Sequence, residues 1–221
     1  WDPDFNTDPI NSINAITLAV LIRRGFEVIG VHIEADTPAP SFQLEVVTRL
    51  GHLGGLEALK LDVPDAKMGP AGCEALARGL QRCTNLRTLW LDIVDNKIDT
   101  AGALALARAL RSLPRLREIW LDLDWNFRGR GEFAGALALA DSLVALPDLE
   151  YLEFSCINTP TNGHQANGAK VAEVISKFRD LRRIQSLRLT FGCDGIDRDE
   201  ARLIGDAWRR LAQIPDLEFD L

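Results

Sequence analysis

The chain has 221 residues, of which 47% are hydrophobic and 26% are charged, and its formal net charge at pH 7 is −7. This balance is typical of a soluble globular protein, and no apolar run approaches the length that crosses a bilayer. The acidic excess also argues against nucleic acid as a partner, because affinity for phosphates depends on Lys and Arg. We therefore expect no membrane insertion and a partner that is a protein, most favourably a basic one.

Two helices are predicted in the first 51 residues. Asp8 and Pro9 form a cap followed by a residue favoured in the first helical turn, and Gly25 supplies the stop. The second helix begins at Ser41 and closes at Gly51. Between these helices, an alternating apolar stretch at 31–33 predicts a strand.

From residue 61 the chain repeats itself at intervals of 30 residues. Leu61, Leu91 and Leu121 begin equivalent windows, each with alternating apolar residues followed by helical spacing. In the clearest copy, the helix over 101–110 is expected to pack its leucines at 104, 106 and 110 on the next helix. Pro114, Pro147 and Pro215 are expected to end later helices.

The repeat continues to the end of the chain with altered spacing. Equivalent positions are Phe154, Leu189 and Phe219, at intervals of 33, 35 and 30 residues. In the two longer copies, we predict that the added residues lie in the turn between strand and helix. After about residue 175 an offset frame, with apolar pairs at 178/181 and 214/217, competes with this one and leaves the register open.

This pattern resembles the leucine-rich repeat, and its length and helical second half resemble the ribonuclease-inhibitor-like class. The resemblance implies an α/β solenoid, a horseshoe with parallel strands on the concave face and helices on the convex face. We expect a single domain over 1–221 with about seven repeats of 30–35 residues, as an excerpt of a longer chain. Ala66 and Thr159 stand where the family has an Asn that satisfies backbone groups, so the ladder of such residues is expected to be interrupted there.

The strand columns that the repeat frame displays on the concave face carry acids and two tryptophans. Shifting the frame by one residue would bury these groups and expose leucines, which costs several kcal/mol per unpaired carboxylate. Aligned carboxylates repel one another and do not help the fold, but they attract a cationic partner, and indoles are enriched at binding hot spots. The predicted partner-binding residues are Trp90, Trp120, Asp62, Asp92, Asp122, Asp124, Glu34 and Glu153.

A purely structural interpretation of the same columns stays open. Asp is a polar residue that suits this strand, and Lys60, Arg188 or His32 could neutralise part of the row. Trp90 and Trp120 could equally pack beneath a neighbouring loop.

No converging set of catalytic groups is evident. His32, His52 and His164 fall in a strand, at a helix end and in a loop, so we predict no enzyme activity, no metal and no cofactor. The four cysteines lack metal-ligand spacing and are interpreted as reduced thiols of an intracellular, cytoplasmic protein. Relatives of the resembled class imply alternatives: a GTPase-activating protein using Arg128 and Arg130, the sensor domain of a larger ATPase or ubiquitin ligase, or an architectural subunit of a large assembly.

Overall fold

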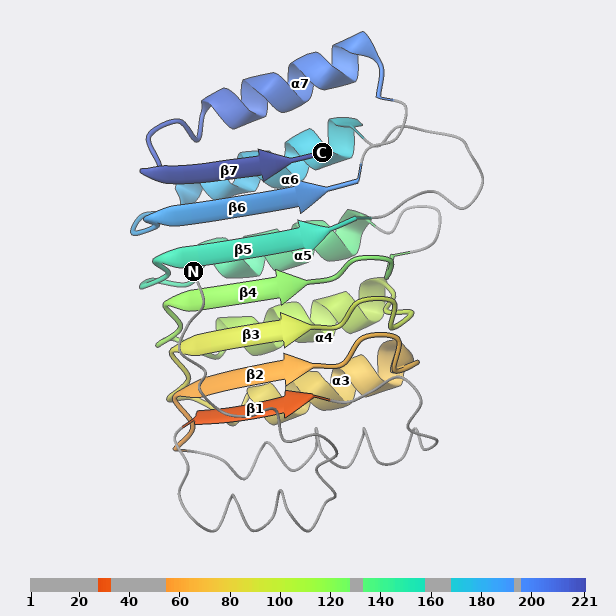
Figure 1. The fold of residues 1–221 in the computed structure, drawn as a ribbon, viewed down its shortest axis with the longest axis vertical. Helices are drawn as coiled ribbons and strands as arrows, with labels where there is room; N and C mark the ends of the chain where they lie inside the picture. Colours follow the sequence, from red (N-terminus) through yellow and green to blue (C-terminus); the bar gives the residue numbers. More distant parts are fainter. Residues whose placement is uncertain (1–27, 33–54, 128–132, 158–167, 193–195) are drawn as a thin grey trace.

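The computed structural model describes residues 28–32, 55–127, 133–157, 168–192 and 196–221, and of 28–32 the backbone alone. Seven strands form one parallel sheet whose spatial order follows the sequence (Figure 1). Each strand therefore pairs with the strand of the next repeat, as in a solenoid. The strands are β1 Val28–His32, β2 Ala58–Asp62, β3 Thr88–Asp92, β4 Glu118–Asp122, β5 Tyr151–Cys156, β6 Ser186–Phe191 and β7 Asp216–Asp220.

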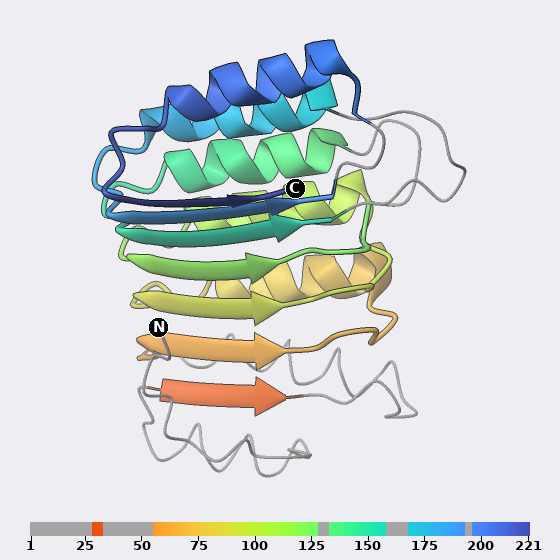
Figure 2. The same cartoon turned by 45° about the horizontal axis from the view of Figure 1, so that its top comes forward.

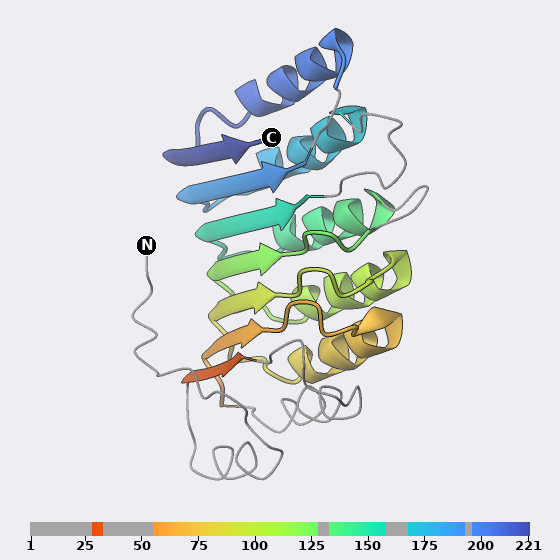
Figure 3. The same ribbon diagram turned by 45° about the vertical axis from the view of Figure 1, so that its right-hand side comes forward.

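Helices connect consecutive strands from β2 onward and lie together on one side of the sheet (Figures 2 and 3). They are α3 Gly69–Leu80, α4 Thr100–Arg111, α5 Phe133–Val144, α6 Gly168–Lys177 followed by the 3-10 turn η1 Phe178–Asp180, and α7 Arg198–Arg209. The α/β leucine-rich-repeat-like fold is thus confirmed, whereas the helices predicted before residue 51 lie outside the described residues. Strands sit about 4.8 Å apart and helices need about 8–10 Å, so the sheet lines the inside of the curve. We call the side of the sheet away from the helices the concave face.

The strand register settles the competing frames. Leu61 pairs with Leu91, Leu91 with Leu121, and the column continues through Phe154, Leu189 and Phe219. The frame that keeps the apolar column aligned is therefore the right one to the end of the chain. The offset frame is wrong because Phe178 belongs to the 3-10 turn after α6 and packs in the core with no exposed surface.

The lengthened copies keep their strands in register because the extra residues lie between strand and helix, as predicted. In the regular copy, α4 begins at residue 100, nine residues after Leu91. In the longer copies, α5 begins twelve residues after Leu121 and α6 fourteen residues after Phe154. The additional three and five residues account for the whole of the longer intervals. Strand pairing consequently does not depend on turn length.

The core lies between sheet and helices. Alternate strand residues point into it, so that β2, β3 and β4 each show the same alternation of half-buried and buried side chains. Glycines let neighbouring helices approach closely: a Cβ at Gly102 would lie 3.2 Å from Cβ of Cys73, and one at Gly135 would lie 2.8 Å from Cβ of Ala103. Larger residues at these positions would force the helices apart.

One predicted core residue is misplaced. Leu106 and Leu110 of α4 are fully buried, but Leu104 is 40% exposed on the convex side. Leu104 shares its helix face with the exposed Arg108 and Arg111, four and seven residues later, because such spacing returns to the same side of a helix. The prediction that Leu104 packs on the next helix is therefore wrong.

The asparagine ladder expected from the resemblance is present where the sequence supplies it. The Nδ2 group of Asn96 donates to the Val63 carbonyl at 2.6 Å, and that of Asn126 donates to the Ile93 carbonyl at 2.7 Å. The side-chain oxygen of Asn126 accepts from the backbone N–H of Asn96 at 2.9 Å. Both amides are buried, so each satisfies backbone groups that water cannot reach. Of the two predicted interruptions, Ala66 is buried without such an amide, and Thr159 lies outside the described residues.

Candidate concave-face binding site

Two rows of side chains cross the concave face of strands β2 to β7, because parallel strands in register place equivalent residues side by side. The indole row, nearer the start of each strand, is Lys60, Trp90, Trp120, Glu153, Arg188 and Glu218. The aspartate row, two residues further on, is Asp62, Asp92, Asp122, Ser155, Thr190 and Asp220. Equivalent residues recur at the repeat intervals, so the sequence repeat alone predicted which residues share a row.

The two tryptophans of the indole row stack on each other. Their ring centroids are 4.4 Å apart and the planes differ by 25°, so the two indoles form one aromatic unit across β3 and β4. The Nζ atom of Lys60 lies 4.3 Å from the centre of the Trp90 ring, a cation–π contact on the outer face of the pair. Each indole is half-buried, because each covers one face of the other.

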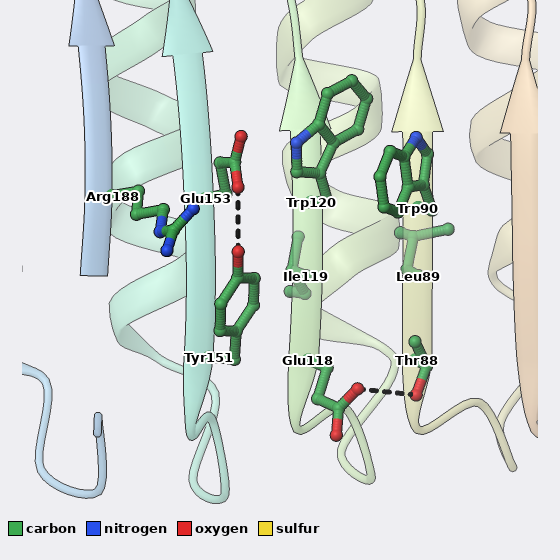
Figure 4. Close-up of a pocket in the computed structure, with 9 residues that line it drawn as sticks. All are labelled: Thr88, Leu89, Trp90, Glu118, Ile119, Trp120, Tyr151, Glu153 and Arg188. Carbon is green, nitrogen blue, oxygen red and sulfur yellow. Dashed lines mark hydrogen bonds between the residues drawn. The ribbon is translucent and has the colours of Figure 1, made fainter. Parts of the chain in front are cut away.

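A hollow of about 160 Å³ lies beside the indole pair and is lined by residues of β3, β4, β5 and β6 (Figure 4). Its polar wall is ordered: the Tyr151 hydroxyl donates to Oε2 of Glu153 at 2.8 Å, and the Thr88 hydroxyl donates to Oε2 of Glu118 at 3.4 Å. The lining residues are Thr88, Leu89, Trp90, Glu118, Ile119, Trp120, Tyr151, Glu153 and Arg188.

The aspartates beyond the hollow have structural duties of their own. Oδ1 of Asp92 accepts from the Val94 N–H at 3.1 Å, and Oδ1 of Asp122 accepts from the Asp124 N–H at 3.0 Å. An Asp side chain commonly satisfies the backbone two residues ahead in this way where a strand ends. The structural interpretation of the aspartate column is thus partly correct, since these carboxylates order the strand ends as well as lining the face.

Asp124 is bound even more firmly into the fold. Its Oδ1 accepts from the Ser155 hydroxyl and from the Ile157 N–H, both at 2.7 Å. Asp124 therefore ties the end of β4 to the end of β5, and much of its acceptor capacity is used within the fold.

Asp122 has an unusual acidity. Burial, the negative charges of Asp124 and Asp92 and a side-chain hydrogen bond with Asp124 together raise the pKa of its carboxyl from 3.8 to about 7, against the lowering effect of the backbone hydrogen bond from Asp124. At neutral pH this carboxyl is consequently protonated part of the time. The row carries less negative charge than a count of its aspartates indicates.

Most of the residues expected to bind a partner are brought to one surface. Trp90, Trp120 and Glu153 line the hollow; Asp62, Asp92 and Asp122 are the last residues of β2, β3 and β4, and Asp124 lies two residues after β4. Glu34 lies outside the described residues. Of the neutralising partners considered, Lys60 sits on the Trp90 ring, and Nε of Arg188 lies 3.3 Å from Oε2 of Glu218. His32 is in β1, for which the backbone alone is described.

Sequence reasoning missed three residues beside the predicted ones. Tyr151 and Glu118 line the hollow two residues before the indole row, in the column that reads Ala58, Thr88, Glu118, Tyr151 and Ser186. Residues of this column face the same side of the sheet as the indole row, so the repeat spacing could have predicted their position as well. Trp125, three residues after the end of β4, is 42% exposed and has a φ of 61°, in the left-handed region that a bulky side chain rarely adopts. Its two equivalents are Asp65 and Asp95, and only the change of residue type marks the position.

Other candidate chemistry finds no geometric support in the described part of the chain. Within those ranges no group of three or more His, Cys, Asp or Glu side chains could hold a metal ion. None of the helices that the structure describes is long and apolar enough to cross a membrane. Arg128 and Arg130, the arginines of the GTPase-activating alternative, lie outside the described residues.

Comparison with known proteins supports the class of fold. The chain has the leucine-rich-repeat-like arrangement of parallel strands alternating with helices. A similar solved structure is the C-terminal domain of tropomodulin from Caenorhabditis elegans, with a TM-score of 0.51 and 8% sequence identity, covering 91% of this chain and 95% of that one. No protein-family model matches the chain, and no curated protein matches it either. At this identity the likeness concerns the fold alone.

Proposed function

We propose that the chain is a non-enzymatic protein-interaction module that binds a basic partner on its concave face. The observation that carries this proposal is the stacked Trp90–Trp120 pair beside a hollow on a surface rich in carboxylates. Large aromatic surfaces at a hollow supply binding energy when a partner covers them. The surrounding carboxylates attract a cationic partner and orient it before contact.

The charge of this face supports the sign of the partner. On the strands and strand ends from β2 to β7, two cations, Lys60 and Arg188, face the concave side, and both already have contacts within the protein. The acids on the same face are Asp62, Asp92, Glu118, Asp122, Asp124, Glu153, Asp216, Glu218 and Asp220. This imbalance gives a negative potential that persists even when Asp122 is protonated.

The test is affinity capture from a cell extract followed by mass spectrometry. The double variant Trp90→Ala/Trp120→Ala and, separately, Asp92→Lys/Asp122→Lys should each lose the captured protein, by tenfold or more for the indole variant, since hot-spot residues contribute about 2 kcal/mol or more each. Arg108→Ala, on the exposed side of α4, is the matched control and should capture normally. Circular dichroism of every variant checks that the repeats remain folded.

One observation favours an architectural role as the second candidate. Leu104 is 40% exposed on the convex side, and Leu137 and Ala138 of α5 are also only partly buried. In that case Leu104→Glu, and not the indole variant, should release the protein from its complex. Capture that survives both concave-face variants but is lost with Leu104→Glu would replace the proposed function with the architectural one.

A further inference from the structure

The hollow beside the indole pair has the size of a single side chain. A single water molecule needs a cavity of roughly 10–15 Å³, so a hollow of about 160 Å³ admits a much larger group. Trp90 of β3 and Trp120 of β4 line it together with Tyr151 and Glu153 of β5 (Figure 4). A group that enters there meets an aromatic face and a carboxylate together.

The indole pair already shows what its ring faces accept. Lys60 covers the outer face of Trp90, and Trp120 covers the inner face. The remaining face of the pair belongs to Trp120, and on the side away from Trp90 the row continues with Glu153 of β5 in place of a lysine. Among the residues that the structure describes, no cation lies over the Trp120 ring.

The carboxylate opposite Trp120 is held in place. Oε2 of Glu153 accepts the hydrogen bond of the Tyr151 hydroxyl, which fixes the direction of the carboxylate and leaves its other oxygen to accept further donors. Glu118 supplies a second carboxylate at the same hollow, steadied by Thr88. Two acids and one aromatic face around a side-chain-sized space complement a planar cation.

We propose that this hollow binds one arginine side chain of the partner, with the guanidinium stacked on Trp120 and paired with Glu153. This proposal rests on the proposed function and names the group that the concave face recognises. Arginine fits better than lysine because its guanidinium is planar, stacks on aromatic faces and presents paired donors to a carboxylate. Among the described residues that line the hollow, the cation is Arg188, whose Nε lies 3.3 Å from Oε2 of Glu218 on the next strand and whose charge limits the affinity by repulsion.

The experiment uses N-acetyl-arginine amide, which carries one guanidinium and no charged termini, titrated into the whole chain while the indole N–H signals are followed by NMR. N-acetyl-citrulline amide, which has the same shape without the charge, should shift these signals at least tenfold more weakly. N-acetyl-lysine amide should bind less tightly than the arginine compound.

Three variants assign the contacts. Trp120→Leu should weaken arginine binding by about tenfold, within the range of cation–π energies, and Glu153→Gln by about fivefold. Arg188→Gln should tighten binding by about twofold, because it removes the repelling cation; a residue with a purely structural role would not produce a gain. Glu74→Gln is the matched control, since Glu74 is exposed on α3, on the convex side, and loses the same charge.

Two results would overturn the arginine site. Equal binding of the arginine and citrulline compounds would remove the cation from the proposal, and equal effects of Glu153→Gln and Glu74→Gln would show net charge acting without a local contact. The outcome is separable from the proposed function: if the indole double variant abolishes protein capture while arginine amide does not bind, the concave face binds its partner by other contacts. Preferred binding of N-acetyl-aspartate amide would assign the hollow to an acidic side chain through Arg188 instead.

Discussion

The middle repeats, β2 to β4, and the C-terminal repeats, β5 to β7, solve the same packing problem with different residues. The middle repeats keep 30-residue spacing, line the core with leucines and hold their strand ends with Asn96 and Asn126. The C-terminal repeats begin at intervals of 33, 35 and 30 residues, and their core contains an aromatic series. The ring centroid of Phe154 lies 5.9 Å from that of Phe178 and 6.0 Å from that of Phe191. The ring centroids of Phe191 and Phe219 are 6.4 Å apart.

This difference shows which positions of the repeat are constrained. The strand column stays in register in both halves, although its residues change from leucine to phenylalanine and the following turn lengthens. The concave face changes more freely, from Asp92 and Asp122 to Ser155 and Thr190. Surface columns are therefore available for recognition, whereas the inward column sets the fold.

The largest expected effect is the loss of the central phenylalanine. Phe154→Ala should lower the free energy of unfolding by about 3–5 kcal/mol, because this ring is fully buried and contacts two other rings. Chemical denaturation measures the loss. Leu104→Ala, at a 40% exposed leucine, is the control and should change stability by less than about 0.5 kcal/mol.

Hydrogen exchange sharpens this prediction, since each repeat contacts mainly its neighbours. In Phe154→Ala, amides of β5 and β6 should exchange faster while those of β2 keep their protection. Uniform acceleration across all strands would contradict the division into two regions.

The asparagine ladder should give the next largest effect, and it is confined to the middle repeats. Asn126→Ala should cost about 3 kcal/mol, because it leaves the Ile93 carbonyl and the N–H groups of Asn96 and Ile98 without their side-chain partner. Asn85→Ala removes a half-buried amide that accepts an exposed hydrogen bond from Arg115, and it should cost clearly less than Asn126→Ala. Similar denaturation midpoints for the two variants would show that the ladder does not stabilise the repeats.

Most of the fold could be predicted from the sequence because the repeat interval determines which residues of neighbouring strands pair. The spacing of the apolar residues alone was enough to predict the column that runs from Leu61 to Phe219. Leu104 was misassigned because a leucine was weighted by its type and not by its helix face, on which Arg108 and Arg111 also lie. The spacing of Leu104, Arg108 and Arg111 along the chain already places all three on one face of the helix.

The candidate site was predictable only as columns. Spacing put Trp90 and Trp120 side by side, but the rotamers that stack them and open a hollow toward Tyr151 depend on neighbouring side chains. Likewise, sequence alone counts Asp122 as a full charge, whereas its burial between two other aspartates raises its pKa. Contacts and desolvation are properties of the assembled surface, which no single repeat contains.

The smallest expected effect concerns this carboxyl and follows pH. The pKa of Asp122 is about 7 in the folded chain and 3.8 at its ordinary value, so between these pH values the folded state holds a proton that the unfolded state has released. The contribution of Asp122 to stability is therefore full below pH 4 and is lost as pH rises through 7. Asp122→Asn cannot ionise and should be the more stable protein at pH 8, by about 1–2 kcal/mol after allowance for its solvent exposure, with no advantage near pH 4.

Asp220→Asn is the matched control, because Asp220 occupies the same row on the exposed edge strand β7. Its stability difference at pH 8 should be smaller than that of Asp122→Asn, since an exposed carboxylate keeps its hydration. Thermal unfolding from pH 4 to pH 8, with an NMR titration of the Asp122 carboxyl carbon, measures both quantities. A constant stability difference between Asp122→Asn and the parent chain across this range would show that Asp122 ionises normally and that the aspartate row bears its full charge at neutral pH.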